Sequence, residues 1–82
     1  MAKKCPAIQH LIGLRIKELR AATAHTQESL ALRAGLDRTY INSVENGRRN
    51  ISVQALDKII TALDSSFKAF FSTPTFNSKG PR

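Results

Sequence analysis

Apolar residues recur at three- and four-residue spacing along most of the chain, which is the period of amphipathic helices. One such run extends from Ile8 to Ala22. Its apolar positions are Ile8, Leu11, Ile12, Ile16 and Leu19. A second run extends from Val53 to Leu63 and begins after Ser52, a good N-cap residue. Because no segment shows the alternation of a strand, the pattern predicts an all-α fold.

Capping residues divide the middle of the chain into shorter helices. Thr26 is a good N-cap for a helix that ends at Gly35, where glycine can take a left-handed backbone conformation. Asp37 is placed to cap a further helix that runs to about Asn46. A last short helix is expected from about Ser66. Together these signals predict a compact fold of five short helices.

The helix predicted from Asp37 to Asn46 has one polar face that contains no acidic residue. At about 100° per residue, this face gathers five side chains. They are Arg38, Thr39, Asn42, Ser43 and Asn46. Such side chains suit hydrogen bonds to base edges and phosphates, whereas the opposite face is apolar and suited to packing. We interpret this helix as the one that contacts DNA.

The two helices around Gly35 have the pattern of a helix-turn-helix. Close crossing requires a small residue, which Ala31 supplies, and the sharp turn favours glycine. Apolar residues stand at the offsets that would hold the pair together: Leu30, Leu36, Ile41 and Val44. The alternative is an ordinary pair of helices in a small bundle, but the outward polar face favours the DNA-binding motif.

Length and charge set the domain organisation. The chain of 82 residues is long enough for one small domain, and its net charge of +7 suits a polyanionic partner. We expect a basic N-terminal arm at residues 1–7, a helix-turn-helix DNA-binding and dimerisation domain at 8–72, and a flexible tail at 73–82. Residues 8–72 carry only nine Lys and Arg against six Asp and Glu, so the clustering of the cations matters more than their number.

Other classes of protein find little support. No apolar run approaches the roughly 18 residues of a membrane span, and no signal peptide is apparent, so we expect a cytoplasmic protein. Cys5, His10 and His25 are too few and too scattered for a tetrahedral zinc site. Because no catalytic constellation or phosphate-binding loop stands out, we expect no enzymatic activity, cofactor, metal or small-molecule ligand.

Three stretches carry a family resemblance. IGLRIKELR, TQESLALRAGLDRTYINSVENGRRNIS and VQALDKIITAL resemble the lambda-repressor-like helix-turn-helix DNA-binding family over about residues 8–71. The part LDRTYINSVENGRRNIS is most similar to the controller proteins of restriction–modification systems, and short regulators of phage and toxin–antitoxin operons share much of it. The resemblance implies a five-helix domain whose second motif helix enters the major groove.

The resemblance also implies roles for individual residues. Base contacts are expected from Arg38, Thr39, Asn42 and Ser43. Phosphate contacts are expected from Gln27, Tyr40, Asn46, Arg48 and Arg49. Arg20 and Glu45 match a structural ion pair that would hold the recognition helix, with two solvated charges as the alternative.

The function expected from these features is transcriptional regulation by a homodimer on a palindromic operator in double-stranded DNA, with higher-order assembly on DNA left open. The C-terminal part has more apolar residues than one small core is expected to use. We predict that the dimer interface draws on Leu56, Ile59, Leu63, Phe67, Phe70 and Phe71, some of which must also fill the core. Two alternatives remain: an antitoxin or other protein-interaction module of a toxin–antitoxin operon, and a non-specific nucleic-acid binder.

Overall fold

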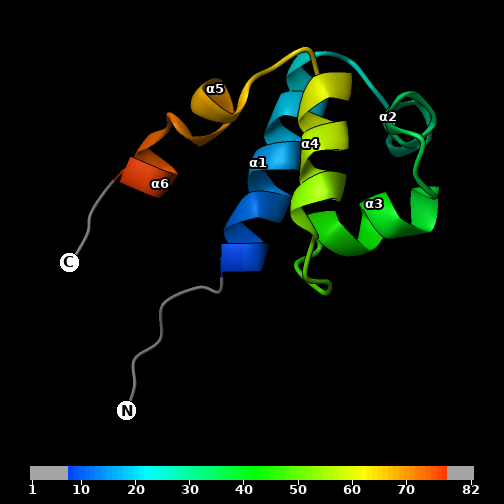
Figure 1. Cartoon of the computed structure of the whole chain (residues 1–82), viewed down its shortest axis with the longest axis horizontal. Coiled ribbons are helices and arrows are strands. Elements are labelled where there is room, and N and C mark those ends of the chain that lie inside the picture. Colours follow the sequence, from blue (N-terminus) through cyan, green and yellow to red (C-terminus); the bar gives the residue numbers. More distant parts are fainter. Residues whose placement is uncertain (1–7, 78–82) are drawn as a thin grey trace.

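The computed structural model describes residues 8–77, and within this range every regular element is a helix (Figure 1). The helices are α1 (Ile8–Ala22), α2 (Gln27–Ala34), α3 (Arg38–Glu45), α4 (Val53–Ala62), α5 (Phe67–Phe71) and α6 (Pro74–Asn77). The all-α, five-helix prediction is confirmed, with α6 as a short addition. The expected N-terminal arm at residues 1–7 and the end of the expected tail lie outside the described residues.

Helices α2 and α3 lie at one end of the molecule and α5 and α6 at the other, with α1 and α4 between them (Figure 1). Helix α3 packs against both α1 and α2, while α4 packs against α2 and α5. A single core joins these elements. Its fully buried side chains are Phe70, Ile16, Leu30, Ile41, Ile59, Ile60 and Val44. Because α1 to α5 all contribute to this core, α3 is held in a fixed position relative to the rest of the domain.

The predicted caps are present. The side-chain oxygens of Thr26, Asp37 and Ser52 each accept a hydrogen bond from a backbone N–H in the first turn of α2, α3 and α4, respectively. Ser66 caps α5 in the same way, accepting from the Ala69 N–H at 3.1 Å. These bonds satisfy N–H groups that have no partner inside the helix, which is why the helices begin at these residues.

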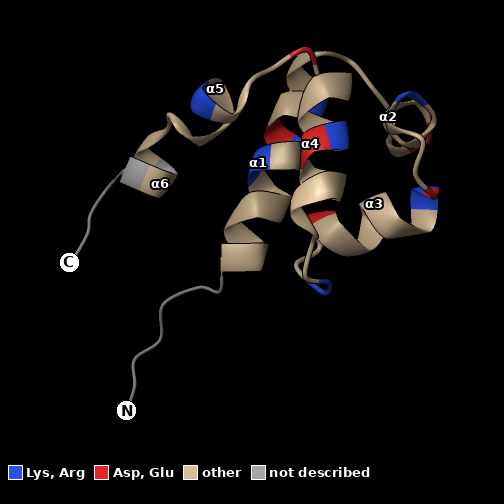
Figure 2. Cartoon of the chain, viewed as in Figure 1, with Lys and Arg blue, Asp and Glu red and all other residues tan. Residues whose placement is uncertain are grey.

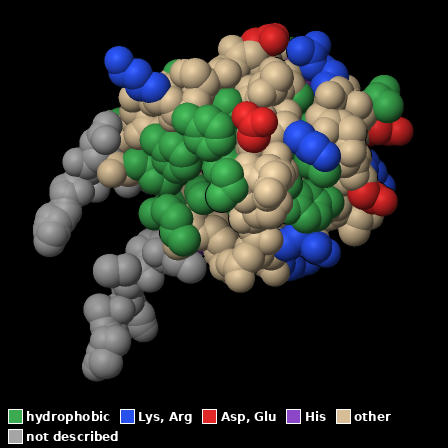
Figure 3. All heavy atoms as spheres, in the orientation of Figure 1, with side chains coloured by type: hydrophobic (Ala, Val, Ile, Leu, Met, Phe, Trp, Pro, Cys, Tyr) green, Lys and Arg blue, Asp and Glu red, His purple; other side chains and the backbone are tan. Residues whose placement is uncertain are grey.

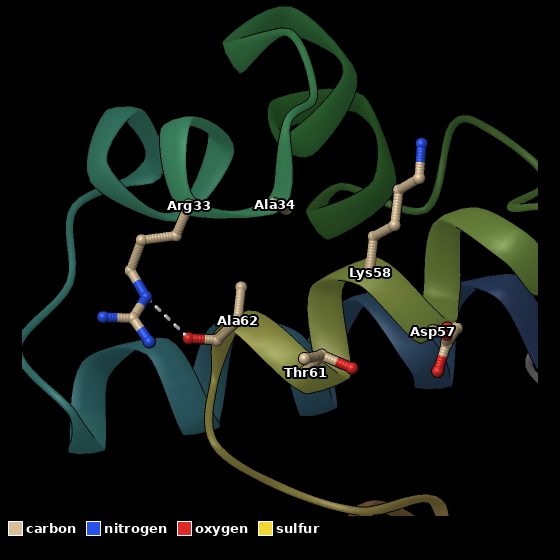
Figure 4. Close-up of a pocket in the computed structure, with 6 residues that line it drawn as sticks. All are labelled: Arg33, Ala34, Asp57, Lys58, Thr61 and Ala62. Atoms are coloured by element: carbon tan, nitrogen blue, oxygen red, sulfur yellow. Dashed lines mark hydrogen bonds between the residues drawn. The ribbon is translucent and has the colours of Figure 1, made fainter.

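At the C-terminal ends of two helices, arginine side chains donate hydrogen bonds to backbone carbonyls. Arg33 Nε donates to the carbonyl oxygen of Ala62 at 3.0 Å, across a shallow hollow between α2 and α4 (Figure 4). Arg15 Nε donates to the Phe70 carbonyl at 2.8 Å, and its Nη2 donates to the Ala69 carbonyl at 3.0 Å. Arg15 therefore fixes the short helix α5 against α1.

Part of the segment predicted as a flexible tail from residue 73 forms the one-turn helix α6 at residues 74–77. The reason is an aromatic cluster. The ring of Phe76 lies 4.9 Å from that of Phe71, measured between centroids, in an edge-to-face arrangement, and 6.3 Å from that of Phe70. Such contacts stabilise beyond the area that they bury, so they order this turn of chain on the core.

The described residues 8–77 offer neither a membrane span nor a metal site. None of their helices combines the length and the apolar character that crossing a bilayer requires. Within the same range, no three His, Cys, Asp or Glu side chains gather closely enough to hold a metal ion. Cys5, one of the three residues that the sequence shows as too scattered for a zinc site, lies outside this range.

Candidate nucleic-acid interface

Helices α2 and α3 are joined by the three residues 35–37 and form a helix-turn-helix. Gly35 has φ 70° and ψ 33°, the left-handed conformation that the sequence predicted. Its N–H donates to the carbonyls of Ala31 and Leu32, and the Leu36 N–H donates to Ala31 at 2.9 Å. Ala31, the small residue that the sequence predicted at the helix crossing, is buried. The turn therefore sets the direction in which α3 leaves α2.

Gly13 in α1 allows the backbone of α3 to approach closely. A Cβ atom at this position would lie 2.2 Å from the carbonyl oxygen of Val44 and 2.9 Å from that of Glu45. No side chain fits there, so the α1 backbone lies directly against the last turn of α3. Sequence reasoning did not assign this role to Gly13, although a glycine inside a helical pattern is a signal of close packing.

The outward face of α3 carries the side chains that were predicted to read bases. Arg38, Thr39 and Asn42 are exposed, and Ser43 is half-buried. Ile41 and Val44 face the core instead. The exposed face thus offers a guanidinium, a carboxamide and a hydroxyl on one surface, which are groups that bind base edges in the major groove.

Three of the residues predicted to contact phosphates follow α3 directly in the chain. Asn46, Arg48 and Arg49 are exposed in the turn and loop after α3, and Figure 2 shows cationic residues both here and at the first turn of α3. The guanidinium carbon of Arg49 lies 4.9 Å from the centroid of the half-buried Tyr40 ring. This cation–π contact holds the arginine beside α3.

Glu45 is the only buried charged residue among those described, with 3% of its surface exposed. Arg20 donates to it through Nε at 2.6 Å and Nη2 at 3.0 Å. Arg20 Nη1 also donates to the carbonyl of His25 at 2.9 Å. The structure thus brings together the pair singled out from the sequence, with a two-pronged geometry that suits a guanidinium and a carboxylate. The pair connects α1 to the end of α3.

Gln27, at the start of α2, also bonds to this carboxylate. Its Nε2 donates to Glu45 Oε1 at 3.0 Å, and its Oε1 accepts from Asn42 Nδ2 at 3.2 Å. The sequence singled out Gln27 only as a phosphate contact. Its bonds to α3 had no sequence signal because the partners are 18 and 15 residues away along the chain.

The structure places some of the predicted dimer-interface residues in the protomer core and others at the surface. Leu56, Ile59, Leu63 and Phe70 are buried in the core of the protomer. Phe71 is half-buried, and Phe67 is 42% exposed. Figure 3 shows hydrophobic side chains gathered over the part of the surface where α5 and α6 lie beside α1. Apolar surface is therefore available on this side of the protomer.

The fold and the exposed face define a helix-turn-helix protein, and comparison with known proteins agrees. A helix-turn-helix family model matches residues 16–70, and the chain belongs to this family. The chain is 44% identical over 61 residues to control protein C.MunI from a Mycoplasma species, an alignment that covers 73% of this chain and 82% of that protein.

Solved structures show which helix-turn-helix proteins this chain resembles. The chain superposes on the restriction–modification controller protein C.AhdI from Aeromonas hydrophila with a TM-score of 0.75 and 42% identity, covering 78% of this chain and 97% of that one. The controller protein C.Esp1396I, crystallised as a tetramer with its natural 35-base-pair operator, matches with a TM-score of 0.75 and 36% identity, covering 78% and 84%. The predicted resemblance to restriction–modification controller proteins is thus confirmed.

Proposed function

We propose that this protein is a transcriptional regulator of the controller type, which binds a palindromic operator in double-stranded DNA as a homodimer. The observation that carries this proposal is the acid-free polar face of α3, which is exposed while the rest of the helix is fixed to α1 and α2. A relative with the same fold is known as a tetramer on operator DNA, which supports DNA as the partner and higher-order assembly on it.

In this proposal α3 lies in the major groove and its exposed side chains read bases. Arg38 is suited to guanine, whose O6 and N7 accept two hydrogen bonds from one guanidinium. Thr39 offers a methyl group to thymine and a hydroxyl that donates or accepts. Asn42 and Ser43, one turn further along, reach the next bases. These four side chains would determine which operator is chosen.

Phosphate contacts are proposed for α3 with the loop after it, and for the start of α2. Arg48, Arg49 and Asn46 would bind the backbone on one side of the groove, and Tyr40 would do so through its hydroxyl. At the start of α2, next to Gln27, backbone N–H groups that have no partner within the helix would meet a further phosphate. Such contacts fix the position of the protein on DNA without reading its sequence.

The dimer is proposed to be two-fold symmetric and to use the surface around α5. Phe67 would supply the exposed part of the interface, together with the half-buried Phe71 and the outer edges of Leu56 and Leu63. Ile59 and Phe70 would support this surface from beneath. Two recognition helices about 34 Å apart would then fit successive major grooves.

The alternative of an antitoxin gains no support from the comparisons. A regulator of this kind acts where the DNA is, so we place it in the cytoplasm and expect no enzymatic activity and no cofactor. The decisive experiment is footprinting on the DNA upstream of its own gene, with gel shifts in the presence of random competitor DNA. Protection of two symmetric half-sites supports the proposal. If random competitor DNA abolishes binding as effectively as operator DNA does, the protein is instead a non-specific binder.

A further inference from the structure

A chain of hydrogen bonds links the buried carboxylate of Glu45 to the exposed face of α3. The Glu45 side chain is 1% exposed and receives Gln27 Nε2 at 3.0 Å. Gln27 Oε1 in turn accepts from Asn42 Nδ2 at 3.2 Å. The chain of hydrogen bonds therefore begins at the buried Glu45 and ends at the exposed Asn42, which is one of the side chains proposed to read bases.

The chemistry of the groups fixes the direction of this chain. A carboxylate can only accept hydrogen bonds, so the amide nitrogen of Gln27 must face Glu45. The amide oxygen of Gln27 then points away from Glu45 and towards Asn42. Because an oxygen without hydrogen can only accept, Asn42 must turn its own amide nitrogen towards Gln27. The orientation of the Asn42 carboxamide thus follows from the acceptor-only chemistry of a carboxylate that is buried one turn away.

Asn42 keeps hydrogen-bonding capacity for a further partner. Its Nδ2 has a second hydrogen, and its Oδ1 has two lone pairs. Asn46 Nδ2 lies 3.4 Å from Oδ1 but only 2.8 Å from the Asn42 backbone oxygen, so it binds mainly the backbone. One donor and one acceptor in a fixed order match adenine, which presents N7 as an acceptor and N6 as a donor in the major groove.

We propose that Glu45, acting through Gln27, is a positioning residue that orients the Asn42 carboxamide and thereby selects adenine at one base pair of each half-site. The proposal rests on α3 being the helix that reads DNA. It assigns to Glu45 a part in sequence specificity although its side chain is buried. Both carboxylate oxygens of Glu45 accept hydrogen bonds from Arg20, which is the geometry of an acceptor-only group.

Glu45→Gln is the central test. A glutamine at this position can donate as well as accept, so Gln27 and Asn42 are free to adopt either amide orientation. Preferred operators are first selected from a randomised DNA library with the full-length protein. The same selection with Asn42→Ala then shows at which base pair the preference for adenine depends on Asn42. At that base pair, Glu45→Gln should lower the preference for adenine over the other bases roughly fivefold. This is the lower limit of the discrimination that a side chain provides through two hydrogen bonds to one base.

Arg20→Lys is the matched control. It weakens the same buried ion pair but leaves the carboxylate in place to accept from Gln27. This variant should lower the melting temperature and leave the ratio of affinities for the four bases unchanged. If Glu45→Gln does not fold, Gln27→Met breaks the chain of bonds at a half-buried position, and it should reduce the adenine preference at the same base pair.

The outcomes separate the positioning role from the proposed function. Retention of full adenine preference by Glu45→Gln or Gln27→Met would overturn the role of Glu45, as would an Asn42→Ala variant that reads every base pair like the parent. An equal loss of preference in Arg20→Lys would also overturn it, because general loosening of the helix would then explain the effect. A parent protein that prefers no sequence over random DNA would instead contradict the proposed function.

Discussion

At the scale of single residues, the protein separates two kinds of polar group on α3. Arg38, Thr39 and Asn42 are exposed, whereas Glu45 on the same helix is buried and paired with Arg20. The periodicity of the sequence located the exposed group, because side-chain direction on a helix follows from spacing alone. It could not show that Gln27 bonds to two residues of α3, since contacts between distant residues depend on how the helices cross.

Substitutions at the exposed residues should separate reading of bases from binding of the backbone. Arg38→Ala should lower affinity for the specific operator and relax preference at one base pair, because it removes about 1–3 kcal/mol of base discrimination. Arg49→Ala should weaken binding to all sequences alike and reduce the salt slope by about one. Gel shifts over a range of salt concentrations measure both. If the two variants affect specific and random DNA equally, α3 is not the reader.

At the scale of helices, the caps made α2, α3 and α4 predictable from the sequence, because a cap and the helix it begins are neighbours in the chain. Helix α6 was not predictable in this way. It depends on Phe76 meeting Phe70 and Phe71, and the polar residues around it are typical of a tail. Gly13, inside a helical pattern, does signal close packing, but its partner lies about 30 residues away and no local pattern identifies it.

Two glycines offer a direct test of how α3 is held. Gly13→Ala should destabilise the protein by about 3 kcal/mol or more and abolish specific binding, because its Cβ would collide with backbone carbonyls of α3. Gly35→Ala should cost only about 1–2 kcal/mol from its left-handed φ, since nothing lies within 4 Å of the added atom. Urea unfolding and gel shifts compare the two. Equal effects would show that the contact at Gly13 does not hold α3.

Arg15 should be needed to keep α5 in place. Removing its side chain leaves two carbonyls of α5 without a charged donor, so Arg15→Ala should lower the free energy of unfolding by about 1–3 kcal/mol. Lys17→Ala, on the exposed side of the same helix, is the control and should change little. Chemical denaturation measures both variants. A Lys17→Ala effect as large as that of Arg15→Ala would contradict this role.

At the scale of the whole molecule, sequence reasoning anticipated an excess of apolar residues in the C-terminal part, but it could not divide them between core and surface. The structure assigns Leu56, Ile59, Leu63 and Phe70 to the protomer core and leaves Phe67 exposed. The division depends on where α5 lies relative to α4, which no local pattern specifies. A test of assembly should therefore begin at Phe67.

Phe67→Ser should weaken the dimer while leaving the protomer folded, because the side chain is 42% exposed and contributes little to the core. Leu32→Ser is the control, since it removes an apolar side chain that is 82% exposed on α2, away from the proposed interface. Sedimentation at micromolar concentration, with and without DNA, measures both. A parent protein that stays monomeric under both conditions would contradict the homodimer.

The close approach at Gly13 has a consequence for how such a regulator can change its target. Because the α1 backbone meets the α3 backbone there, this contact involves none of the exposed side chains of α3. Exchanges at positions 38, 39, 42 and 43 would therefore alter which bases are read without moving the helix in the groove. A single scaffold could then acquire operators of different sequence, one position at a time, while the spacing of its half-sites stayed constant.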